Sequence, residues 1–486
     1  MSDALLRLIE RLPRARVLCL GDVMLDRFVY GAVERISPEA PIPVMRVLRE
    51  EAMPGGAGNV AANVAALGAR AILVGLVGDD EEANELDELL SARSVDARCF
   101  IAADRRTTAK TRLIGGAQQL LRLDRESTSA PTDQVVRGLL AAFEAALADC
   151  DVVVISDYAK GVLCDAVLAP AIAAARAAGK PVIADPKRPR FDAYAGAAVL
   201  KPNRAELAAA ARMPCGTDAE VEAAARHALE ECGVGALLIT RSEQGLSYVP
   251  RAGAATHVPG RARQVFDVSG AGDSVIAAFA AALAVGAKAE EAANLANLAG
   301  EIVVGKIGTA VVKREDLEAA SLDREIQAYE AKVASRDAAL EAARAWKARG
   351  LRVGFTNGCF DILHPGHVSL LAQARAACDR LIVGLNSDAS VARLKGPERP
   401  VQNEASRAVV LASLGDVDLV TVFDEDTPLE LIRALRPDLL VKGADYTEDG
   451  VVGAADVKSW GGRVLLAELA RGHSTTGAIR RMKGGG

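Results

Sequence analysis

The first 315 residues alternate short apolar runs with alanine-rich amphipathic stretches, and this alternation restricts the folds open to the chain. Continuous runs rich in Val, Ile and Leu are typical of strands buried on both faces of a parallel sheet. These runs occupy residues 15–22, 71–80, 151–158, 181–186, 198–203 and 236–241. Helical stretches between them include 134–149, 166–179 and 217–231. This βαβ order predicts a doubly wound α/β sheet, with functional residues at the carboxyl ends of its strands.

Residues 313–350 interrupt the alternation with a charged, alanine-rich segment that contains no proline. Such a segment is typical of one or two solvent-exposed helices that join domains. After Gly350 the alternation restarts and continues toward the end of the chain. We therefore predict a larger α/β domain over 1–315, a helical connector over 316–350 and a smaller α/β domain over 351–486.

Composition and charge disfavour several classes of function. The net charge is −6 and aromatic residues make up only 3% of the chain, which argues against binding to nucleic acid. No uncharged apolar run is long enough to predict a membrane span, and the first residues lack the pattern of a signal peptide. The eight cysteines include no C-x-x-C pair, which favours a reducing compartment. We expect a cytoplasmic protein that acts on small molecules, without nucleic-acid or membrane partners.

Residues 267–274 (DVSGAGDS) lead directly into an apolar helix and form the first candidate catalytic site. Small residues let successive N–H groups point the same way, and the helix start adds a partial positive charge. Gly270, Ala271 and Gly272 are therefore expected to bind a phosphoryl group, with Asp273 accepting a proton from the attacking hydroxyl. A glycine turn with an acidic residue near a helix start would give the same local pattern. The chain contains no G-x-x-x-x-G-K-[ST] sequence, which argues against a Walker-type kinase.

The segment 267–274 resembles a signature of the PfkB-type carbohydrate kinases, the family of ribokinase, and the resemblance extends over about 1–315. It implies a ribokinase-like sheet with a small β lid, ATP as phosphoryl donor and Asp273 as catalytic base. Two further segments, 21–28 (GDVMLDRF) and 55–68 (GGAGNVAANVAALG), resemble the family's sugar-binding elements. The resemblance assigns to the sugar Asp22, Asp26, Gly55, Gly56 and Asn59.

Residues 201–207 (KPNRAEL) resemble the N-x-x-E element of the same family. The resemblance implies that Asn203 and Glu206 lie near the metal and the ATP phosphates, together with the intervening Arg204 and Ala205. Glu206 is therefore a candidate ligand for Mg²⁺.

Residues 107–126 correspond to the lid strands of this family and contain several cations, Lys110, Arg112, Arg122 and Arg125. Cations at this position suit a sugar that already carries a phosphate, so Lys110 and Arg112 are candidate sugar ligands. Exposed edge strands that carry charge to deter aggregation would show the same pattern. The segment also resembles the heptose-phosphate kinase branch of the family, which favours a phosphosugar.

Residues 355–371 (FTNGCFDILHPGHVSLL) contain the most specific motif of the chain. A strand leads into a loop, and the sequence from His364 to His367 opens a helix with proline at its first turn. Two histidines three residues apart share one helix face and can both donate to phosphate oxygens, which would stabilise charge in a transition state. A helix start with incidental histidines, or a metal pair that uses Cys359, are the alternatives. The chain has only five histidines, so a chance pair within four residues is the weaker explanation.

The motif is similar to the H-x-G-H signature of the nucleotidyltransferase superfamily, which includes glycerol-3-phosphate cytidylyltransferase, over about 353–486. The resemblance implies a Rossmann-like α/β domain with His364 and His367 as catalytic residues. Residues 472–481 (GHSTTGAIRR) resemble a second signature, although His473 stands where the family commonly has isoleucine. The nucleotide-binding candidates are Thr356, Asn357, Gly358, Phe360, Lys395, Lys442, Ser474, Thr475, Thr476 and Arg480. The two lysines alone would equally fit solvated side chains.

A kinase of this type followed by an H-x-G-H transferase resembles the bacterial bifunctional heptose enzymes. The resemblance implies that ATP phosphorylates D-glycero-β-D-manno-heptose 7-phosphate at O1. AMP is then transferred from ATP to heptose 1-phosphate, giving ADP-heptose and pyrophosphate for lipopolysaccharide core synthesis. We expect Mg²⁺ to enter both sites with ATP, without a cage of protein ligands, and the chain to form a homodimer.

Two other functions remain open at this stage. A related fusion could act on another phosphosugar or polyol and use CTP, because the motifs contact phosphates and do not read the nucleobase. A regulator that only binds nucleotide or sugar is the second alternative. Asp273, His364 and His367 argue against a regulator, since mere binding needs neither a base nor paired transition-state donors.

Overall fold

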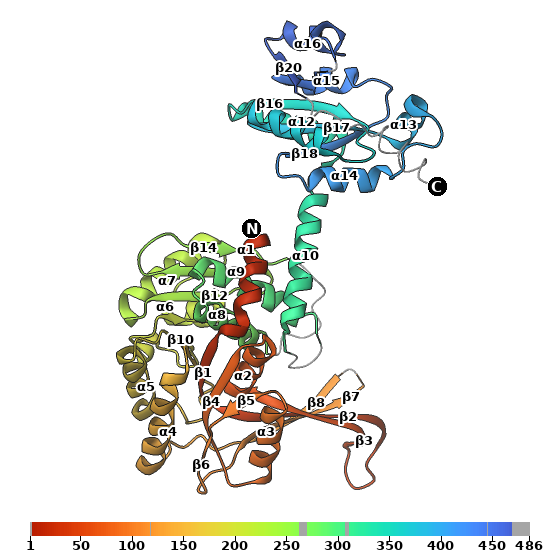
Figure 1. The fold of residues 1–486 in the computed structure, drawn as a ribbon. Helices are drawn as coiled ribbons and strands as arrows, with labels where there is room; N and C mark the ends of the chain where they lie inside the picture. The colour runs from red at the N-terminus through yellow and green to blue at the C-terminus, as the bar shows by residue number, and fades with distance from the viewer. Residues whose placement is uncertain (1, 117, 262–269, 307–310, 445, 469–486) are drawn as a thin grey trace, which may run out of the picture. The chain divides into compact units, whose positions relative to one another are not determined.

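The computed structural model describes residues 2–116, 118–261, 270–306, 311–444 and 446–468. The chain divides into two compact units, Met1–Leu322 and Asp323–Gly486, and each has its own sheet and its own buried core (Figure 1).

A ten-stranded sheet forms the centre of the first unit, in the order β14-β13-β12-β11-β10-β9-β1-β4-β5, with β6 also paired to β4. Neighbouring strands are parallel, except that β13 runs antiparallel to β12 and β14. The strands are β1 (Arg16–Gly21), β4 (Arg70–Val77), β5 (Val95–Ala97), β6 (Phe100–Ile101), β9 (Val152–Ser156), β10 (Val182–Asp185), β11 (Val199–Leu200), β12 (Ala236–Thr240), β13 (Leu246–Pro250) and β14 (Thr256–Val258). Every residue of β9 is buried, as its continuous apolar run predicts.

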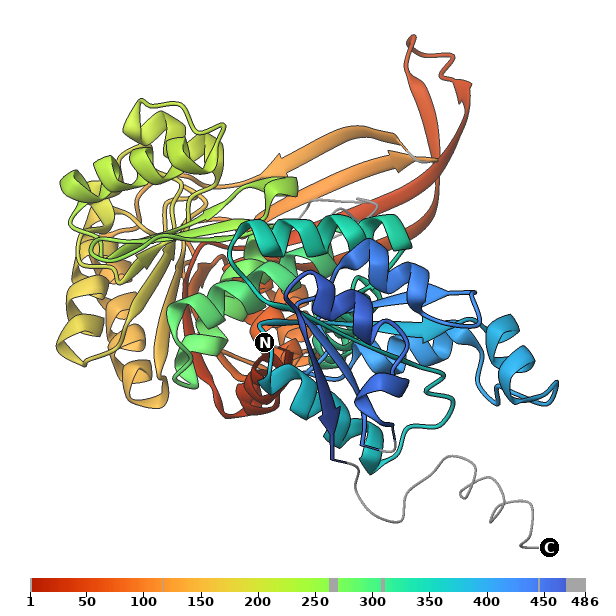
Figure 2. The same ribbon diagram turned by 90° about the horizontal axis from the view of Figure 1, so that it is seen from above.

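Helices cover both faces of this sheet (Figure 1 and Figure 2). Alternate residues of β1 enter different cores: Val17 and Cys19 contact one set of helices, and Leu18 and Leu20 the other. The first set is α1 (Ser2–Arg11), α2 (Ala57–Ala66), α3 (Glu81–Ser91), α8 (Ala271–Ala284) and α9 (Ala289–Val303). The second set is α4 (Asp133–Ala146), α5 (Asp165–Ala177), α6 (Arg204–Ala211) and α7 (Asp218–Cys232). The predicted doubly wound architecture is therefore confirmed.

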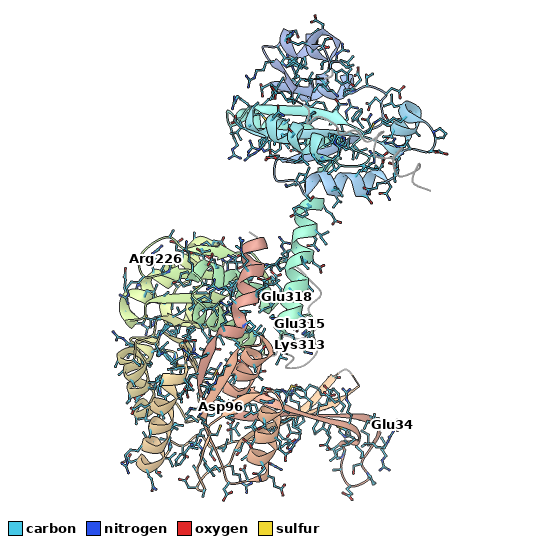
Figure 3. All side chains as sticks on the ribbon, in the orientation of Figure 1. Glu34, Asp96, Arg226, Lys313, Glu315 and Glu318 are labelled. Atoms are coloured by element: carbon cyan, nitrogen blue, oxygen red, sulfur yellow. The ribbon has the colours of Figure 1, made fainter. Side chains whose placement is uncertain are left out.

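A second, four-stranded sheet projects from the first unit and forms the predicted lid, in the order β3-β2-β7-β8 (Figure 2). Its strands are β2 (Val23–Ile36), β3 (Pro43–Gly56), β7 (Thr108–Gly115) and β8 (Gln118–Arg125). The root of β2 is buried, whereas its far end is exposed and carries an ion pair between Glu34 and Arg46, at 3.7 Å (Figure 3). Arg46 lies on the edge strand β3, where charge opposes unwanted strand pairing, so part of the lid's charge has a structural role.

The second unit is built on a six-stranded parallel sheet in the order β15-β18-β17-β16-β19-β20. Its strands are β15 (Val333–Ala334), β16 (Val353–Gly358), β17 (Arg380–Asn386), β18 (Leu419–Phe423), β19 (Leu439–Gly443) and β20 (Arg463–Ala467). Helices α12 (Pro365–Ala376) and α14 (Glu404–Ala412) cover one face, and α11 (Arg336–Ala348), α15 (Leu429–Leu435) and α16 (Ala454–Ser459) cover the other. Helix α13 (Asp388–Lys395) follows β17.

The segment predicted as a connector, 316–350, holds more structure of the second unit than its composition suggests. Helix α10 (Arg314–Glu330) contains the point where the two units divide. Beyond it, β15 pairs with β18, and Ala339 and Ala343 of α11 are buried against the second sheet. An alanine stripe therefore supplies a packed face to a helix whose other side is charged.

Short 3₁₀ turns complete the described structure, at Leu12–Arg14, Leu147–Asp149, Phe191–Tyr194, Ser242–Gln244 and Glu448–Gly450. None of the helices in the described part of the chain is both long and apolar enough to cross a bilayer.

Candidate active sites

The first candidate site centres on Asp273, in the first turn of α8. Its side chain is buried, and each carboxylate oxygen accepts one hydrogen bond. The Asn59 amide donates to Oδ2 at 2.7 Å, and the Tyr158 hydroxyl donates to Oδ1 at 2.8 Å. Burial raises the pKa of Asp273 to about 6, although the two hydrogen bonds oppose that rise. A carboxylate with this pKa is a stronger base than an exposed aspartate and is still mostly ionised at neutral pH.

The predicted anion site lies next to this carboxylate, at the start of α8. Gly270 has a φ of 76° and caps the helix, so a residue with a side chain would be strained there. A Cβ added to Gly272 would lie 3.2 Å from the Lys201 ammonium nitrogen, which forms a buried ion pair of 3.0 Å with Asp185. Sequence reasoning missed both of these charged residues, although Lys201 is the first residue of the segment 201–207 that contains the N-x-x-E element.

Asp22, predicted to contact sugar hydroxyls, has protein partners in the structure. Its buried carboxylate accepts hydrogen bonds from the backbone N–H groups of Tyr158 at 2.8 Å, Lys160 at 3.1 Å and Val162 at 3.1 Å. These bonds shape the loop after β9 that brings Tyr158 to Asp273. Gly56 lies beside this loop with a φ of 58°, and a Cβ there would meet the Asp22 carbonyl oxygen at 2.3 Å.

Asp26, on the lid, also has a protein partner. Its carboxylate accepts a hydrogen bond of 2.6 Å from Arg112, and both side chains are largely buried. A Cβ on Gly55 would lie 2.2 Å from the Asp26 carboxylate, so only glycine allows this close approach. The positive charge of Arg112 is therefore already balanced by Asp26 when no sugar phosphate is bound.

The other lid cations differ in their surroundings. Arg122 pairs with Asp124 and Arg125 pairs with Glu82, both at 2.8 Å. The ammonium nitrogen of Lys110 instead lies 5.8 Å from the centre of the Tyr158 ring, and burial lowers its pKa. Lys110 is thus the lid cation that faces the loop carrying Tyr158.

The N-x-x-E element forms a capping box at the start of α6. The Asn203 side chain accepts from the Glu206 N–H, and the Glu206 side chain accepts from the Asn203 N–H, each at 2.9 Å. Glu206 also lies 3.6 Å from the Lys187 ammonium group. Arg204 and Ala205 occupy the intervening first turn. These local bonds account for the motif without a ligand, which the sequence interpretation did not anticipate.

The second candidate site lies at the start of α12. His364 is the N-cap residue, and the rings of His364 and His367 stack with centres 3.8 Å apart. Phe360, with a φ of 41°, lies against His367 with ring centres 5.0 Å apart. Burial, reinforced by His364 and Lys395, lowers the pKa of His367 to about 4. At neutral pH His367 is therefore uncharged and has a single N–H, which a phosphate oxygen would have to take over from the backbone of Ile362.

The end of β16 supplies further candidate residues beside the histidines. The Thr356 hydroxyl donates to the Val441 carbonyl at 3.0 Å, which ties β16 to β19. The Lys442 ammonium group donates to the Asn357 carbonyl at 3.0 Å. The side-chain oxygen of Asn357 is buried without a hydrogen-bond partner in the described structure. A ligand donor reaching Asn357 would remove that cost of burial.

Arg399, which sequence reasoning did not select, is tied to the loop that precedes the histidines. Its Nε donates to the buried carboxylate of Asp361, and its second guanidinium nitrogen is buried without a hydrogen-bond partner. Asp361 also accepts from the Val401 N–H at 2.7 Å, and the pKa of this carboxyl group is lowered because its hydrogen bonds outweigh its burial. Arg399 lies four residues beyond Lys395 in the segment LKGPERPV, and position alone did not separate it from solvated arginines.

The four remaining nucleotide-binding candidates, Ser474, Thr475, Thr476 and Arg480, lie outside the described residues. All eight cysteines lie within the described part of the chain and are free thiols.

The chain matches two family models, each over one of the two units. The pfkB family carbohydrate kinases match residues 14–315, and the cytidylyltransferase-like proteins match residues 355–480. Proteins called bifunctional protein HldE match almost the entire length. The one from Paramagnetospirillum magneticum is 54% identical over 99% of each chain. The one from Caulobacter vibrioides is 57% identical over 99% of this chain and 100% of that one. This chain belongs to the HldE family.

Solved structures resemble the kinase half of this HldE-family chain. Arabidopsis thaliana ribokinase, solved with ribose and ATP, has a TM-score of 0.52 at 19% identity and covers 63% of this chain and 99% of its own. Phosphofructokinase-2 from Escherichia coli has a TM-score of 0.54 at 22% identity and covers 64% and 99%. These likenesses establish the ribokinase-like fold of the first unit.

The predicted function is confirmed by this membership. The chain is a bifunctional enzyme that uses ATP to phosphorylate heptose 7-phosphate and transfers an adenylyl group to heptose 1-phosphate. It serves the synthesis of ADP-heptose for lipopolysaccharide.

Proposed function

We propose that Asp273 is the catalytic base of the kinase reaction. The O1 hydroxyl of the heptose gives its proton to Asp273 as O1 attacks the γ-phosphorus of ATP. The bond from that phosphorus to the bridging oxygen breaks, and ADP leaves. The backbone N–H groups of Gly270, Ala271 and Gly272 hold the phosphoryl oxygens, and Lys201 adds a nearby positive charge. The observation that carries this proposal is the buried Asp273 carboxylate, oriented by two donors beside a helix start.

The sugar-binding roles follow from the same geometry. Asn59 and Gly55 lie beside Asp273 and Asp26, and Lys110 faces the site from the lid. We assign direct sugar contact to these residues and to the lid pair of Asp26 and Arg112. Asp22 and Gly56 stay candidates for sugar contact, and Asp22 also holds the loop after β9.

In the second unit, His364 and His367 are proposed to donate to the α-phosphate of ATP. An oxygen of heptose 1-phosphate attacks the α-phosphorus, and pyrophosphate leaves. The neutral state of His367 suits a hydrogen-bond donor that takes no proton from the reaction. Gly358 and Phe360 shape the loop before the histidines. The proposed phosphate-binding residues are Asn357, Lys395, Lys442, Ser474, Thr475, Thr476 and Arg480, while Thr356 supports the strand.

Mg²⁺ is proposed to enter each site with ATP and to be held mainly through phosphate oxygens, where it would neutralise developing charge. Among the described residues, no group of three or more His, Cys, Asp or Glu side chains could hold a metal ion. Glu206 uses Oε2 in its capping box with Asn203, and its Oε1, 3.6 Å from the Lys187 ammonium group, is the oxygen that would face the ion. A direct metal contact by Glu206 is therefore compatible with the start of α6 as it stands.

A homodimer in the cytoplasm remains part of the proposal. Large apolar side chains are exposed on the lid strands, among them Ile36, Leu48 and Leu121, which are 63%, 62% and 51% exposed. A second copy covering this sheet would remove them from water, with a gain that grows with the buried area. The free thiols of all eight cysteines agree with a reducing compartment.

Each half-reaction is tested separately, because the product of the kinase is not the substrate of the transferase. The kinase product carries phosphates at C1 and C7, whereas the transferase substrate carries a phosphate at C1 only. Purified chain with heptose 7-phosphate, ATP and Mg²⁺ should yield ADP and a bisphosphate by mass spectrometry. With heptose 1-phosphate and ATP it should yield ADP-heptose and pyrophosphate, and CTP in place of ATP should yield far less product. Equal turnover of heptose lacking the 7-phosphate would contradict the role of Lys110 and Arg112.

A further inference from the structure

Tyr158 connects three parts of the kinase site. It lies two residues after the end of β9, at the carboxyl edge of the sheet, and its hydroxyl donates to Asp273 Oδ1 at 2.8 Å. Its backbone N–H donates to the buried Asp22 at 2.8 Å. Its ring faces the Lys110 ammonium group of the lid, 5.8 Å from the ring centre. The backbone of Tyr158 is thus held by Asp22, and its hydroxyl is hydrogen-bonded to Asp273, the proposed base.

The two donors to Asp273 together fix the rotation of its carboxylate. Asn59 donates to Oδ2, and Tyr158 donates to Oδ1. The Asn59 side chain is buried, with its carbonyl oxygen accepting from the Asn63 amide at 3.2 Å. A carboxylate oxygen has two acceptor positions, so one position on each oxygen is left for an incoming hydroxyl. With either donor removed, the carboxylate could turn away from the direction of the sugar.

We propose that Tyr158 is a positioning residue for the kinase reaction, holding the Asp273 carboxylate in the orientation that accepts the proton from the sugar hydroxyl. This inference rests on the proposed role of Asp273 as the base. It assigns to the loop after β9 a part in catalysis that the recognised motifs do not contain.

The contact has a consequence for the pH dependence of the kinase. Four groups face Asp273 from the surrounding elements: Asn59 on α2, Tyr158 after β9, Asp185 on β10 and Lys201 after β11. A hydrogen bond donated to a carboxylate favours the charged form, so the Tyr158 hydroxyl holds the pKa of Asp273 below the value that burial and Asp185 would set. Loss of this hydroxyl should therefore raise the pKa of the base.

The test is Tyr158→Phe in the full chain, which keeps the ring and removes only the hydroxyl. We expect the acid limb of the kinase pH–rate profile to move up by about one pH unit and kcat to fall about tenfold, with the KM for ATP little changed. The matched control is Tyr248→Phe. Tyr248, on β13, packs against Phe279 of α8, the helix that also carries Asp273, with ring centres 6.3 Å apart. The control should leave both the profile and kcat unchanged.

A second variant keeps the test decisive if Tyr158→Phe unfolds the first unit. Site-specific 3-fluorotyrosine at position 158 keeps the hydroxyl and strengthens it as a donor, so the acid limb should move to lower pH. An acid limb that stays in place in either variant that folds would overturn the inference about Tyr158. Full kinase activity in Asp273→Asn would instead overturn the proposed base, so the two failures are distinguishable.

Discussion

Replacing Asp273 by Asn should stabilise the first unit while removing its kinase activity. Asn keeps the size of the carboxyl group and one oxygen, so the Asn59 amide still has an acceptor. The Tyr158 hydroxyl, which donates to the other oxygen, can turn and accept from the new amide group. The substitution therefore removes a buried charge, and its cost is confined to the Tyr158 hydroxyl hydrogen, which loses its acceptor.

The size of the stabilisation follows from the pKa of the base. Burial raises the pKa of Asp273 from its ordinary value of 3.8 to about 6, which corresponds to about 3 kcal/mol at pH 8 as an upper limit. The folded state binds this proton more tightly than the unfolded chain does. The stability attached to the group is thus complete below about pH 4 and is lost as the pH rises through about 6. The advantage of the Asn variant should be about half as large at pH 5 as at pH 8.

The assay must follow the first unit alone. Both tryptophans of the chain, Trp346 and Trp460, lie in the second unit, so their fluorescence reports that unit. Amide hydrogen exchange of peptides from α8, measured by mass spectrometry at pH 5 and pH 8, reports the first unit. Tryptophan fluorescence in urea then serves as the internal control and should give the same midpoint for both proteins.

Two results would refute this reasoning. If the Asn variant is less stable than the parent at pH 8, the buried carboxylate stabilises the fold and its raised pKa is wrong in sign. If the stability difference does not change between pH 5 and pH 8, Asp273 is not the group that titrates in this range. Retained kinase activity would leave the stability argument intact and remove the catalytic one.

Three further predictions concern other residues. His367→Ala should stop pyrophosphate release, while ADP production by the kinase continues. In the parent enzyme, burial lowers the pKa of His367 to about 4. Protonation of His367 should therefore not reduce the transferase rate between pH 8 and about pH 5. Gly56→Ala should destabilise the first unit by about 3 kcal/mol, measured by hydrogen exchange, because the added Cβ would meet a carbonyl oxygen at 2.3 Å. The control is Gly179→Ala, at a glycine of similar φ with open space around it, which should lower the stability of the unit by about 1 kcal/mol. Asp361→Asn should lower the urea midpoint of tryptophan fluorescence, with a loss of about 3 kcal/mol, because it leaves a buried guanidinium without its counter-charge; an unchanged midpoint would contradict that pairing.

The architecture of both units could be read from the sequence, because buried parallel strands leave continuous apolar runs that no solvated segment imitates. β9 illustrates this, since all of its residues are buried. The start of α8 was equally readable, because glycines followed by an acidic residue define a helix start locally. The segment 333–348 was not, since an alanine-rich charged helix has the same composition whether one face is covered or not.

Contacts between distant residues explain what the sequence could not supply. Tyr158 reaches Asp273 across 115 positions of the chain, and Asp22 binds backbone groups up to 140 positions away. No local sequence pattern predicts these long-range contacts, because they depend on which strands become neighbours in the sheet. Lys201 and Arg399 were missed for the same reason. The capping box of Asn203 and Glu206 is the opposite case, since an Asn followed three residues later by Glu is itself a signal for a helix start.

Each of the four buried clusters draws its residues from one unit only, two from the kinase half and two from the transferase half. Two catalysts with separate interiors are therefore translated as a single polypeptide. Each translated chain contains one kinase unit and one transferase unit, so the two are produced in equal number at any level of expression. A damaging substitution enters one of these interiors, and a lesion there alters the ratio of the two activities that translation had set.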